Sequence, residues 1–170
     1  IHQLSGRPGK LVPINCAALP DTLVENALFG HERGAYTHAT DKADGAFVRA
    51  HRGTLFLDEV GEMALSAQPK LLRALETGEI QPLGASAPLR VDVRVVAATN
   101  RALGGAMSEG TFREDLYARL CGVTVETPPL ADRRIDVMEL LDRFLPSDHP
   151  PITADLAEAL VRYDWPHNVR

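Results

Sequence analysis

The stretch that decides the fold of this chain is GTLFLDEVGEM, at residues 53–63. Residues 54–57 are a short run of apolar and β-favouring side chains, and two carboxylates follow it, Asp58 and Glu59. A continuous apolar run of this length predicts a strand buried on both faces, as in a parallel sheet. Ligands of open α/β sheets bind at the carboxyl ends of the strands. Two acids at that point suit a Mg²⁺ ion held through water and an activated nucleophile, and a strand that simply ends in a polar loop explains them equally well.

The composition is that of an ordinary globular chain. Of the 170 residues, 45% are hydrophobic and 24% are charged, so we expect one substantial core. The formal net charge of −5 argues against a nucleic-acid footprint over the whole domain. Cys16 and Cys121 are far apart and form no CxxC, which suits free thiols in a reducing compartment and gives no metal site.

No targeting or membrane segment is visible. No apolar stretch approaches the ~20 residues that a membrane span needs, and there is no signal peptide. We therefore expect a cytoplasmic protein. Because the chain starts at Ile1 and not at Met, we also expect it to be an excised piece of a longer protein.

Strand and helix patterns alternate over most of the chain. Besides residues 54–57, strand patterns cover 10–15, 93–98 and 122–127, and the strand at 93–98 is expected to be buried. Helix patterns cover 20–30, 46–51, 66–78, 101–109 and 111–120, and a hairpin pattern covers 79–92. From Pro128 onward the patterns are helical only, at 133–145, at 153–163 and in a third helix that starts at 165. We expect an α/β parallel-sheet core over 1–127 and a small helical subdomain over 128–170.

Two segments suggest interactions beyond the core. Residues 30–45 form a polar loop that is long enough to do more than connect two elements. In the predicted helix at 111–120, Arg113 and Arg119 flank an apolar stripe. Such arginines usually extend into solvent, and they could equally point into an interface that the stripe helps to build. The stripe consists of Phe112, Leu116 and Leu120.

Taken together, the motifs of this chain resemble the central AAA+ ATPase domain of sigma-54-dependent transcriptional activators, the bacterial enhancer-binding proteins. The order and spacing of the motifs make the resemblance specific, and it runs nearly end to end. The matching stretches are INCAALP at 14–20, ALFGHERGAYTHA at 27–39, GTLFLDEVGEM at 53–63, VRVVAATN at 93–100, GTFREDLYARL at 110–120 and WPHNVR at 165–170.

The resemblance implies a fold, an activity and partners. The fold would be an AAA+ three-layer parallel-sheet core with a small, truncated α-helical lid. The activity would be ATP hydrolysis with Mg²⁺, in a homo-oligomeric ring of six or seven subunits. The partner would be sigma-54 RNA polymerase holoenzyme, with DNA bound through a domain outside this chain and no membrane involved. Receiver or ligand-sensing domains would also lie outside it.

The resemblance also implies a role for each residue of the nucleotide site. Asp58 and Glu59 would be the Walker B acids, of which Asp58 holds the water shell of Mg²⁺ and Glu59 orients and deprotonates the attacking water. Asn15 matches the asparagine of the family's glutamate switch, which holds Glu59 away from the water. Without the family, an ordinary turn residue is the simpler interpretation of Asn15. Thr99 and Asn100 match sensor I, which reads the γ-phosphate.

Three arginines complete the set that the resemblance implies. Arg113 and Arg119 match the paired arginine fingers that act on the nucleotide of the neighbouring subunit. Such a finger contributes ~10³–10⁵ in rate by neutralising charge in the transition state. Arg170 matches sensor II, which acts within its own subunit from the helical lid.

The chain departs from the family pattern at the phosphate-binding loop, GxxxxGK[ST], which is absent. In the family this loop lies just upstream of the position of Ile1, and its backbone N–H groups and lysine cradle the phosphates. We expect the loop in the full-length protein. Without it, we expect this chain alone to bind ATP poorly and to be inactive.

A second departure lies in the loop with which the family contacts the sigma factor. This chain reads GAYTHA where the family has GAFTGA, and the residues are Gly34, Ala35, Tyr36, Thr37, His38 and Ala39. Tyr36 keeps the aromatic ring and adds a hydroxyl. His38 adds a Cβ where the backbone needs a positive φ or a close approach, or it is a solvated residue without consequence.

Two functions stay open for the parent protein. One is a motor that hydrolyses ATP and remodels sigma-54 RNA polymerase closed complexes through the GAYTHA loop. The other is a related transcription regulator with altered or lost sigma-54 contact, a non-motor regulatory module, and His38 is its only support in the sequence. An open-complex assay with and without His38→Gly separates the two.

Overall fold

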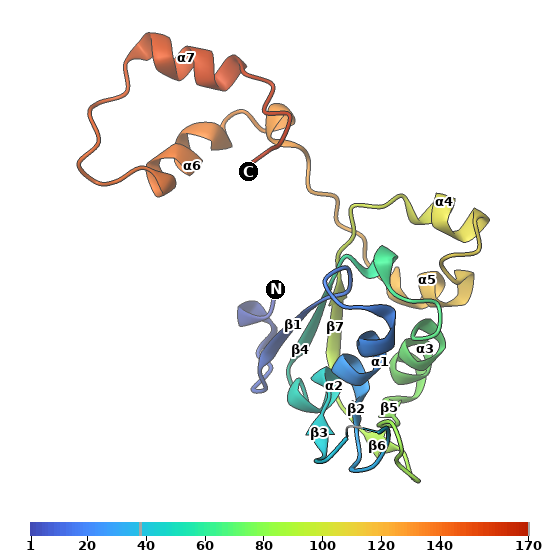
Figure 1. Cartoon of the computed structure of the whole chain (residues 1–170). Helices are drawn as coiled ribbons and strands as arrows, with labels where there is room; N and C mark the ends of the chain where they lie inside the picture. The colour runs from blue at the N-terminus through green and yellow to red at the C-terminus, as the bar shows by residue number, and fades with distance from the viewer. Residues whose placement is uncertain (38, 170) are drawn as a thin grey trace. The chain divides into compact units, whose positions relative to one another are not determined.

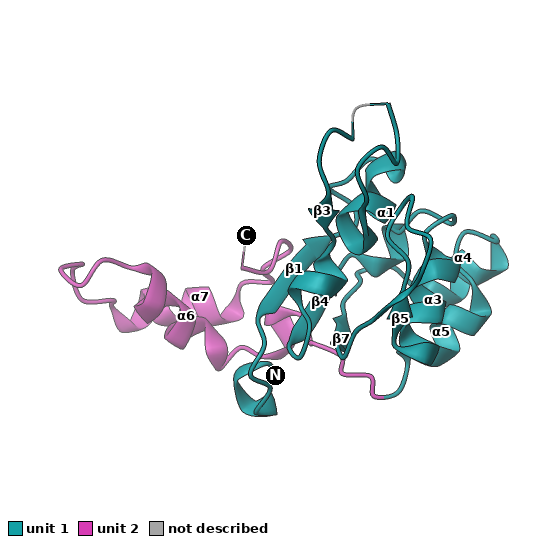
Figure 2. Cartoon of the chain, turned by 90° about the horizontal axis from the view of Figure 1, so that it is seen from below, with its two compact units in different colours: residues 1–122 teal, residues 123–170 magenta. Residues whose placement is uncertain are grey.

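A computed structural model describes residues 1–37 and 39–169 of the chain. His38 and Arg170 lie outside the described residues. The chain forms two compact units, Ile1–Gly122 and Val123–Arg170, which Figure 2 distinguishes by colour. The first unit is α/β and the second is helical, so strands and helices alternate only in the first.

A three-stranded parallel sheet organises the first unit, with β4 in the middle (Figure 1). Strand β4 spans Thr54–Asp58 and pairs with β1, Leu11–Asn15, on one side and with β7, Arg94–Ala97, on the other. Both pairings are parallel, so all three carboxyl ends meet at one edge. The prediction of an α/β fold around a parallel sheet is confirmed.

Helices cover the sheet face to which Leu55 and Leu57 point, and both leucines are fully buried. Phe56 points to the opposite face, because side chains alternate along a strand, and it is only partly buried. On that face the Thr54 hydroxyl lies 2.9 Å from Nδ1 of His2. The expectation that β4 is buried on both faces therefore holds fully for one face only.

The helices of the first unit follow the predicted order. They are α1 at Asp21–Phe29, α2 at Ala46–Arg49, α3 at Gln68–Thr77, α4 at Leu103–Ser108 and α5 at Glu114–Leu120. The 3-10 turns Gln3–Ser5 and Val60–Glu62 stand in addition to these predicted helices. Helix α3 ends at Gly78, whose φ of 68° is the left-handed conformation that a glycine adopts without strain.

Two short antiparallel pairs complete the first unit. The predicted hairpin over 79–92 is present as β5, Glu79–Ile80, and β6, Leu89–Arg90. The loop predicted at 30–45 is closed at its root by β2, Gly30–His31, and β3, Ala43–Asp44. The remainder of that loop has no regular structure in the part that is described.

The second unit contains the 3-10 turn Leu130–Asp132 and two helices, α6 at Asp136–Phe144 and α7 at Ala154–Arg162. Thr153 caps α7 as predicted, because its hydroxyl accepts a hydrogen bond from the backbone N–H of Leu156. The helices that the structure describes are all too short or too polar to span a lipid bilayer.

Two predicted elements are absent from the described chain, and their absence has a local cause. Residues 122–127 form no strand, since this alternating segment finds no partner strand and leaves Val123 87% exposed and Val125 79% exposed. Residues 166–169 form turns, and no third helix starts at 165 in the described chain. Trp165 and Asn168 both have a positive φ, which a right-handed helix does not allow.

Two other predicted elements differ in burial or length. Strand β7 is not fully buried, because within the described residues it pairs with β4 alone and its end residues Arg94 and Ala97 are exposed. Helix α5 starts at Glu114 and not at 111, because the backbone of Arg113 is extended. Phe112 is nevertheless buried, so the predicted apolar stripe is present across the helix boundary.

Leu57 supplies a direct test of the central strand. Replacing it by alanine removes a fully buried side chain, and we expect the free energy of unfolding to fall by about 2–5 kcal/mol in a urea titration. The matched control is Leu11→Ala on the neighbouring strand, where the side chain is 50% exposed and the loss should be well below that at Leu57. Equal losses at the two positions would contradict the assignment of β4 as the core strand.

Candidate functional site

The two acids that follow β4 are held between the ends of both neighbouring strands. In the register of the sheet Asn15 lies beside Asp58. The backbone N–H of Cys16 donates to the carbonyl of Asp58 at 2.9 Å, and the N–H of Ala98 donates to the carbonyl of Leu57 at 2.8 Å. The structure thus brings the ends of three strands to one place, as expected for a site at the carboxyl edge of a parallel sheet.

Glu59 has a left-handed backbone, with φ 51° and ψ 46°. For a residue other than glycine this conformation costs on the order of 1–2 kcal/mol, so its surroundings must stabilise it. The N–H of Glu59 donates to Oδ1 of Asp58 at 3.1 Å, and its Oε2 accepts from the N–H of Asn100 at 3.2 Å. Asp58, Glu59 and Asn100 are therefore directly connected.

The loops after β4 and β7 are also joined through Arg101, which the sequence reasoning did not single out. Its guanidinium donates to the carbonyl of Gly61 at 3.1 Å and lies 3.4 Å from Oε2 of Glu62. The Thr99 hydroxyl accepts from the N–H of Arg101 at 3.1 Å. A Cβ on Gly61 would lie 2.8 Å from that hydroxyl, so only glycine fits there without a shift.

Asn15 is exposed and serves the turn after β1. Its Oδ1 accepts from the backbone N–H groups of Ala17 at 2.9 Å and Ala18 at 3.2 Å. Within the described residues no hydrogen bond joins Asn15 to Glu59. In this state the asparagine has the geometry of a turn residue, and its amide nitrogen is not used by these two bonds.

An open cleft of about 400 Å³ lies beside these side chains. Its lining residues are Cys16, Ala17, Leu19, Asp21, Glu59, Glu62 and Asn100. Three of them are acids, and carboxylate oxygens are the ligands that a hard cation such as Mg²⁺ prefers. Among the described residues, no group of three or more His, Cys, Asp and Glu side chains is close enough together to hold a metal directly.

The two predicted finger arginines lie at the two ends of α5, and neither bonds to the acids after β4. Arg113 forms a two-pronged ion pair with Asp115, at 3.0 and 2.6 Å. This pair raises the pKa of Arg113 and lowers the pKa of Asp115, in both cases chiefly through the shared hydrogen bond. Arg119 donates to the carbonyl of Leu75 at the end of α3, at 3.0 Å from Nη2.

Gln68 fixes the position of Arg113, and sequence reasoning missed it. Its side chain is fully buried and donates from Nε2 to the carbonyls of Met63 and Thr111, each at 3.0 Å. Its Oε1 accepts from the backbone N–H of Arg113 at 2.9 Å. One amide thus joins the segment after Glu59 to the start of α5. The available signal was a glutamine on the apolar side of α3, three residues before the buried Leu71.

The GAYTHA loop is closed by backbone hydrogen bonds. Gly34 has a φ of +80° and donates its N–H to the carbonyl of Ala39 at 2.8 Å. The N–H of Ala39 donates to the carbonyl of Tyr36 at 2.9 Å. Tyr36 is 46% exposed, whereas Ala39 is buried. Thr37 is exposed, and His38 lies outside the described residues.

The root of this loop is attached to the segment 81–85. The N–H of Glu32 donates to the carbonyl of Leu83, and the N–H of Leu83 donates to the carbonyl of Gly30, both at 2.9 Å. A Cβ on Gly84 would lie 2.9 Å from Cβ of Ala35, so the two segments are in close contact.

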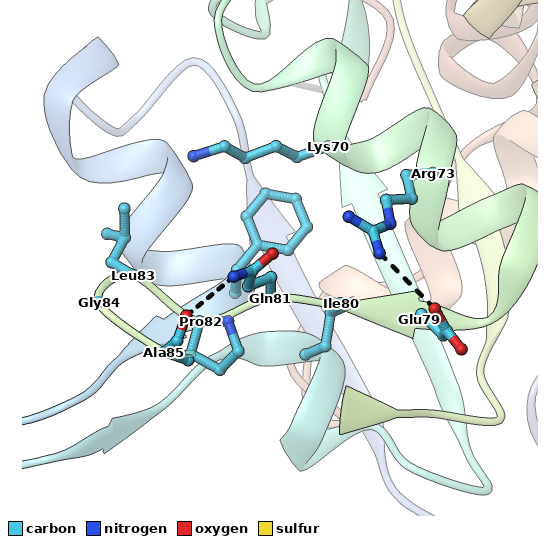
Figure 3. Close-up of a pocket in the computed structure, with 10 residues that line it drawn as sticks. Lys70, Arg73, Glu79, Ile80, Gln81, Pro82, Leu83, Gly84 and Ala85 are labelled. Carbon is cyan, nitrogen blue, oxygen red and sulfur yellow. Dashed lines mark hydrogen bonds and ion pairs between the residues drawn. The ribbon is translucent and has the colours of Figure 1, made fainter. Parts of the chain in front are cut away.

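A second cavity, of about 330 Å³, lies between segment 81–85 and α3 (Figure 3). Lys70 and Arg73 line it from the helix, and Arg73 pairs with Glu79 at 3.7 Å. Gln81 donates to the carbonyl of Ala85 at 2.8 Å and so closes the turn. Residues named from the sequence as site residues do not line this cavity.

Comparison with known proteins adds to this geometry. A family model described as the sigma-54 interaction domain matches residues 1–126. The nitric oxide reductase transcription regulator NorR1 of Cupriavidus necator is 50% identical over 178 residues, which cover 100% of this chain and 35% of that protein. The DNA-binding transcriptional regulator NtrC of Azospirillum brasilense is 47% identical, over 96% of this chain and 35% of that protein. The chain thus spans about a third of the length of these relatives.

Solved structures of NtrX from Brucella abortus have the same fold. The complex of NtrX with ATP superposes with a TM-score of 0.83 and 36% identity, over 95% of this chain and 36% of NtrX. The complex with ADP gives a TM-score of 0.84 over the same shares of the two chains.

Replacing Gln68 by leucine tests the link between the two segments that it joins. The substitution leaves two carbonyls and one N–H without their partner inside the protein, and we expect the free energy of unfolding to fall by at least about 2 kcal/mol in urea denaturation. Gln81→Leu is the matched control, since the hydrogen bond from Gln81 to the Ala85 carbonyl is exposed to water and its loss should have little effect. A Gln68 variant as stable as this control would show that the three bonds contribute nothing.

The thiol of Cys16 gives a pH-dependent test of the same edge. Burial, and secondly the charge of Asp58, raise its pKa from 9.0 to about 11. The thiolate is the reactive form, so alkylation of Cys16 in a folded Cys121→Ser variant should still rise about tenfold per pH unit between pH 8 and 10. The same thiol in urea should reach a plateau above pH 9. A plateau near pH 9 in the folded protein would contradict the burial of this thiol.

Proposed function

This chain belongs to the family of sigma-54 interaction domains, the AAA+ central domains of sigma-54-dependent transcriptional activators, and on that premise we propose that it is the ATP-hydrolysing motor of such an activator. The observation that carries the proposal is the direct connection of Asp58, Glu59 and Asn100 at the carboxyl edge of the sheet. A strand that simply ended in a polar loop would not require Glu59 to adopt a left-handed conformation. Nor would it require the side chain of Glu59 to bond to the loop after the neighbouring strand β7.

Asp58 and Glu59 divide the chemistry between them. Asp58 uses Oδ1 to accept from the N–H of Glu59, and its Oδ2 makes no hydrogen bond within the part of the chain that is described, which leaves it for a water of the Mg²⁺ shell. When bound, Mg²⁺ would neutralise charge on the phosphates. Glu59 orients the attacking water and takes its proton.

Thr99 and Asn100 act as sensor I in this proposal. The N–H of Asn100 already donates to Glu59, so a shift of this loop toward a γ-phosphate moves the base as well. Asn15 acts as the switch residue. Its amide nitrogen is the donor that a carboxylate needs. Asn15 is not hydrogen-bonded to Glu59 in the described chain, which fits a state in which the asparagine does not hold the base.

The arginines act between subunits. Arg113 and Arg119 are exposed and bonded to partners at the two ends of α5, so they do not serve the acids of their own chain in this state. A homo-oligomeric ring of six or seven subunits would place them at the nucleotide of the neighbour, after Arg113 leaves Asp115. Arg170 would serve as sensor II, although it lies outside the described residues.

The GAYTHA loop is the proposed contact with sigma-54 RNA polymerase. Its closed backbone presents the half-exposed ring of Tyr36, as an aromatic contact residue requires. DNA binding, signal reception and the phosphate-binding loop belong to other parts of the cytoplasmic parent protein. The relatives that match over a third of their length are named as transcription regulators, which supports this division of labour.

Glu59→Gln tests the assignment of the base in the full-length parent with its phosphate-binding loop. The amide keeps the shape of the side chain but cannot take a proton, so we expect ATP turnover to fall by at least about a hundredfold. Binding of a fluorescent ATP analogue should change little.

Glu62→Gln is the matched control, because Glu62 lines the same cleft but carries no catalytic role in this proposal. Its turnover should stay within about threefold of the unmodified protein, a change of under 1 kcal/mol. Turnover retained in the Glu59 variant would rule out Glu59 as the base.

A further inference from the structure

His31 is a buried polar residue that the proposed chemistry does not use. Its side chain is 7% exposed. Nδ1 lies 2.7 Å from Oδ1 of Asn26 on α1, and the imidazole ring lies 5.0 Å from the ring of Tyr36 at an angle of 58°. One side chain therefore contacts both a helix of the core and the aromatic residue of the GAYTHA loop.

The contact with Asn26 requires a hydrogen on Nδ1 of His31. An amide oxygen only accepts hydrogen bonds, so Nδ1 of His31 carries the hydrogen and donates it to Asn26. Tilted aromatic rings at this separation attract each other beyond the effect of burying their surface. The two contacts use different parts of His31, so substitutions can remove them one at a time.

The backbone of His31 is fixed independently of its side chain. It pairs with Ala43 in the β2–β3 ladder and forms a bridge with Leu83. The flanking Gly30 and Glu32 add hydrogen bonds to Leu83. Removing the imidazole therefore leaves the root of the loop attached and changes only its connection to α1 and to Tyr36.

Helix α1 runs from the cleft of the candidate site to this contact. Asp21, its first residue, lines the acidic cleft, and Asn26 lies in its second half. Its buried end is fixed by Phe29, whose ring stacks on that of Phe47 at 5.7 Å. Over its nine residues the helix is about 14 Å long, and we expect a shift at one end to move the other end as well.

We propose that His31 is a positioning residue for the sigma-factor contact loop, and that it ties Tyr36 to helix α1 and through this helix to the nucleotide cleft. The inference rests on the proposed function, since it assigns a partner to the loop. It predicts that loss of the contacts of His31 with Asn26 and Tyr36 weakens contact with the sigma factor but leaves ATP hydrolysis nearly unchanged.

The experiment uses the full-length parent and four variants. His31→Phe keeps a ring beside Tyr36 but cannot donate to Asn26. His31→Asn keeps a donor at the place of Nδ1 but has no ring. Asn26→Ala removes the acceptor at a partly exposed position that tolerates a small side chain. His51→Phe is the control, because His51 is exposed and lies outside the loop and the cleft.

The first readouts are ATP turnover and binding of sigma-54 in the presence of ADP with aluminium fluoride, a mimic of the transferring phosphoryl group. In His31→Phe and Asn26→Ala we expect turnover within about threefold of the unmodified protein and sigma-54 binding weaker by about tenfold, the value of one lost hydrogen bond. His31→Asn should lose about threefold. The His51 variant should bind normally.

A purely structural role gives a different pattern. It would lower turnover, thermal stability and sigma-54 binding together, and that result would overturn the inference. Unchanged sigma-54 binding in both His31→Phe and Asn26→Ala would overturn it as well. If His31→Phe does not fold, Asn26→Ala decides the question, because it removes the same hydrogen bond from the helix side.

A second readout distinguishes failure of the inference from failure of the proposed function. Amide hydrogen exchange of the peptide covering residues 30–44 needs no sigma factor. We expect the exchange in the unmodified parent to change on addition of ADP with aluminium fluoride, and this response to be lost in His31→Phe and Asn26→Ala. A parent that shows the response but binds no sigma-54 refutes the proposed contact and leaves the tie in place. A response that persists in both variants refutes the tie.

Discussion

The carbonyl oxygens of Leu57 and Asp58, at the end of β4, are the constraint on which the rest of the first unit depends. One accepts from Ala98 after β7 and the other from Cys16 after β1, so both neighbouring strands end level with the two acids. Parallel pairing with a buried middle strand therefore decides where the polar side chains gather. Glu59 and Asn100 come from segments far apart in the sequence and meet because of these backbone bonds, which also place Asn15 beside Asp58.

Around this edge, buried polar side chains connect the working parts of the domain. Gln68 joins the segment after Glu59 to Arg113, and His31 joins α1 to Tyr36. Both are buried and have hydrogen-bond partners, so each holds a defined position. The same core thus supports the half-site that we assign to ATP hydrolysis, the arginines that we assign to a neighbouring subunit and the loop that we assign to the sigma factor.

The sequence predicted what depends on local pattern and on motif. The apolar run at 54–57, the strands on either side of it and the cap at Thr153 follow from periodicity and capping. It did not predict what depends on partners distant in sequence. Residues 122–127 have the alternation of a strand but no strand to pair with in the described chain, and propensity alone does not form a ladder. Gln68 looks unremarkable in sequence, because its acceptor Thr111 lies 43 residues away. His31 does so because only the folded chain brings its ring to both Asn26 and Tyr36.

The central claim is that each catalytic site is shared, with Glu59 from one subunit and Arg113 from the next. The most direct measurement is ATP turnover in rings assembled from a mixture of two inactive full-length variants, Glu59→Gln and Arg113→Ala. Each interface that joins an intact Glu59 to an intact Arg113 of the other variant contains a complete site, so the mixture should regain activity that neither variant has alone. A mixture as inactive as its components, with ring assembly intact, would contradict the claim and place both residues in the site of one chain.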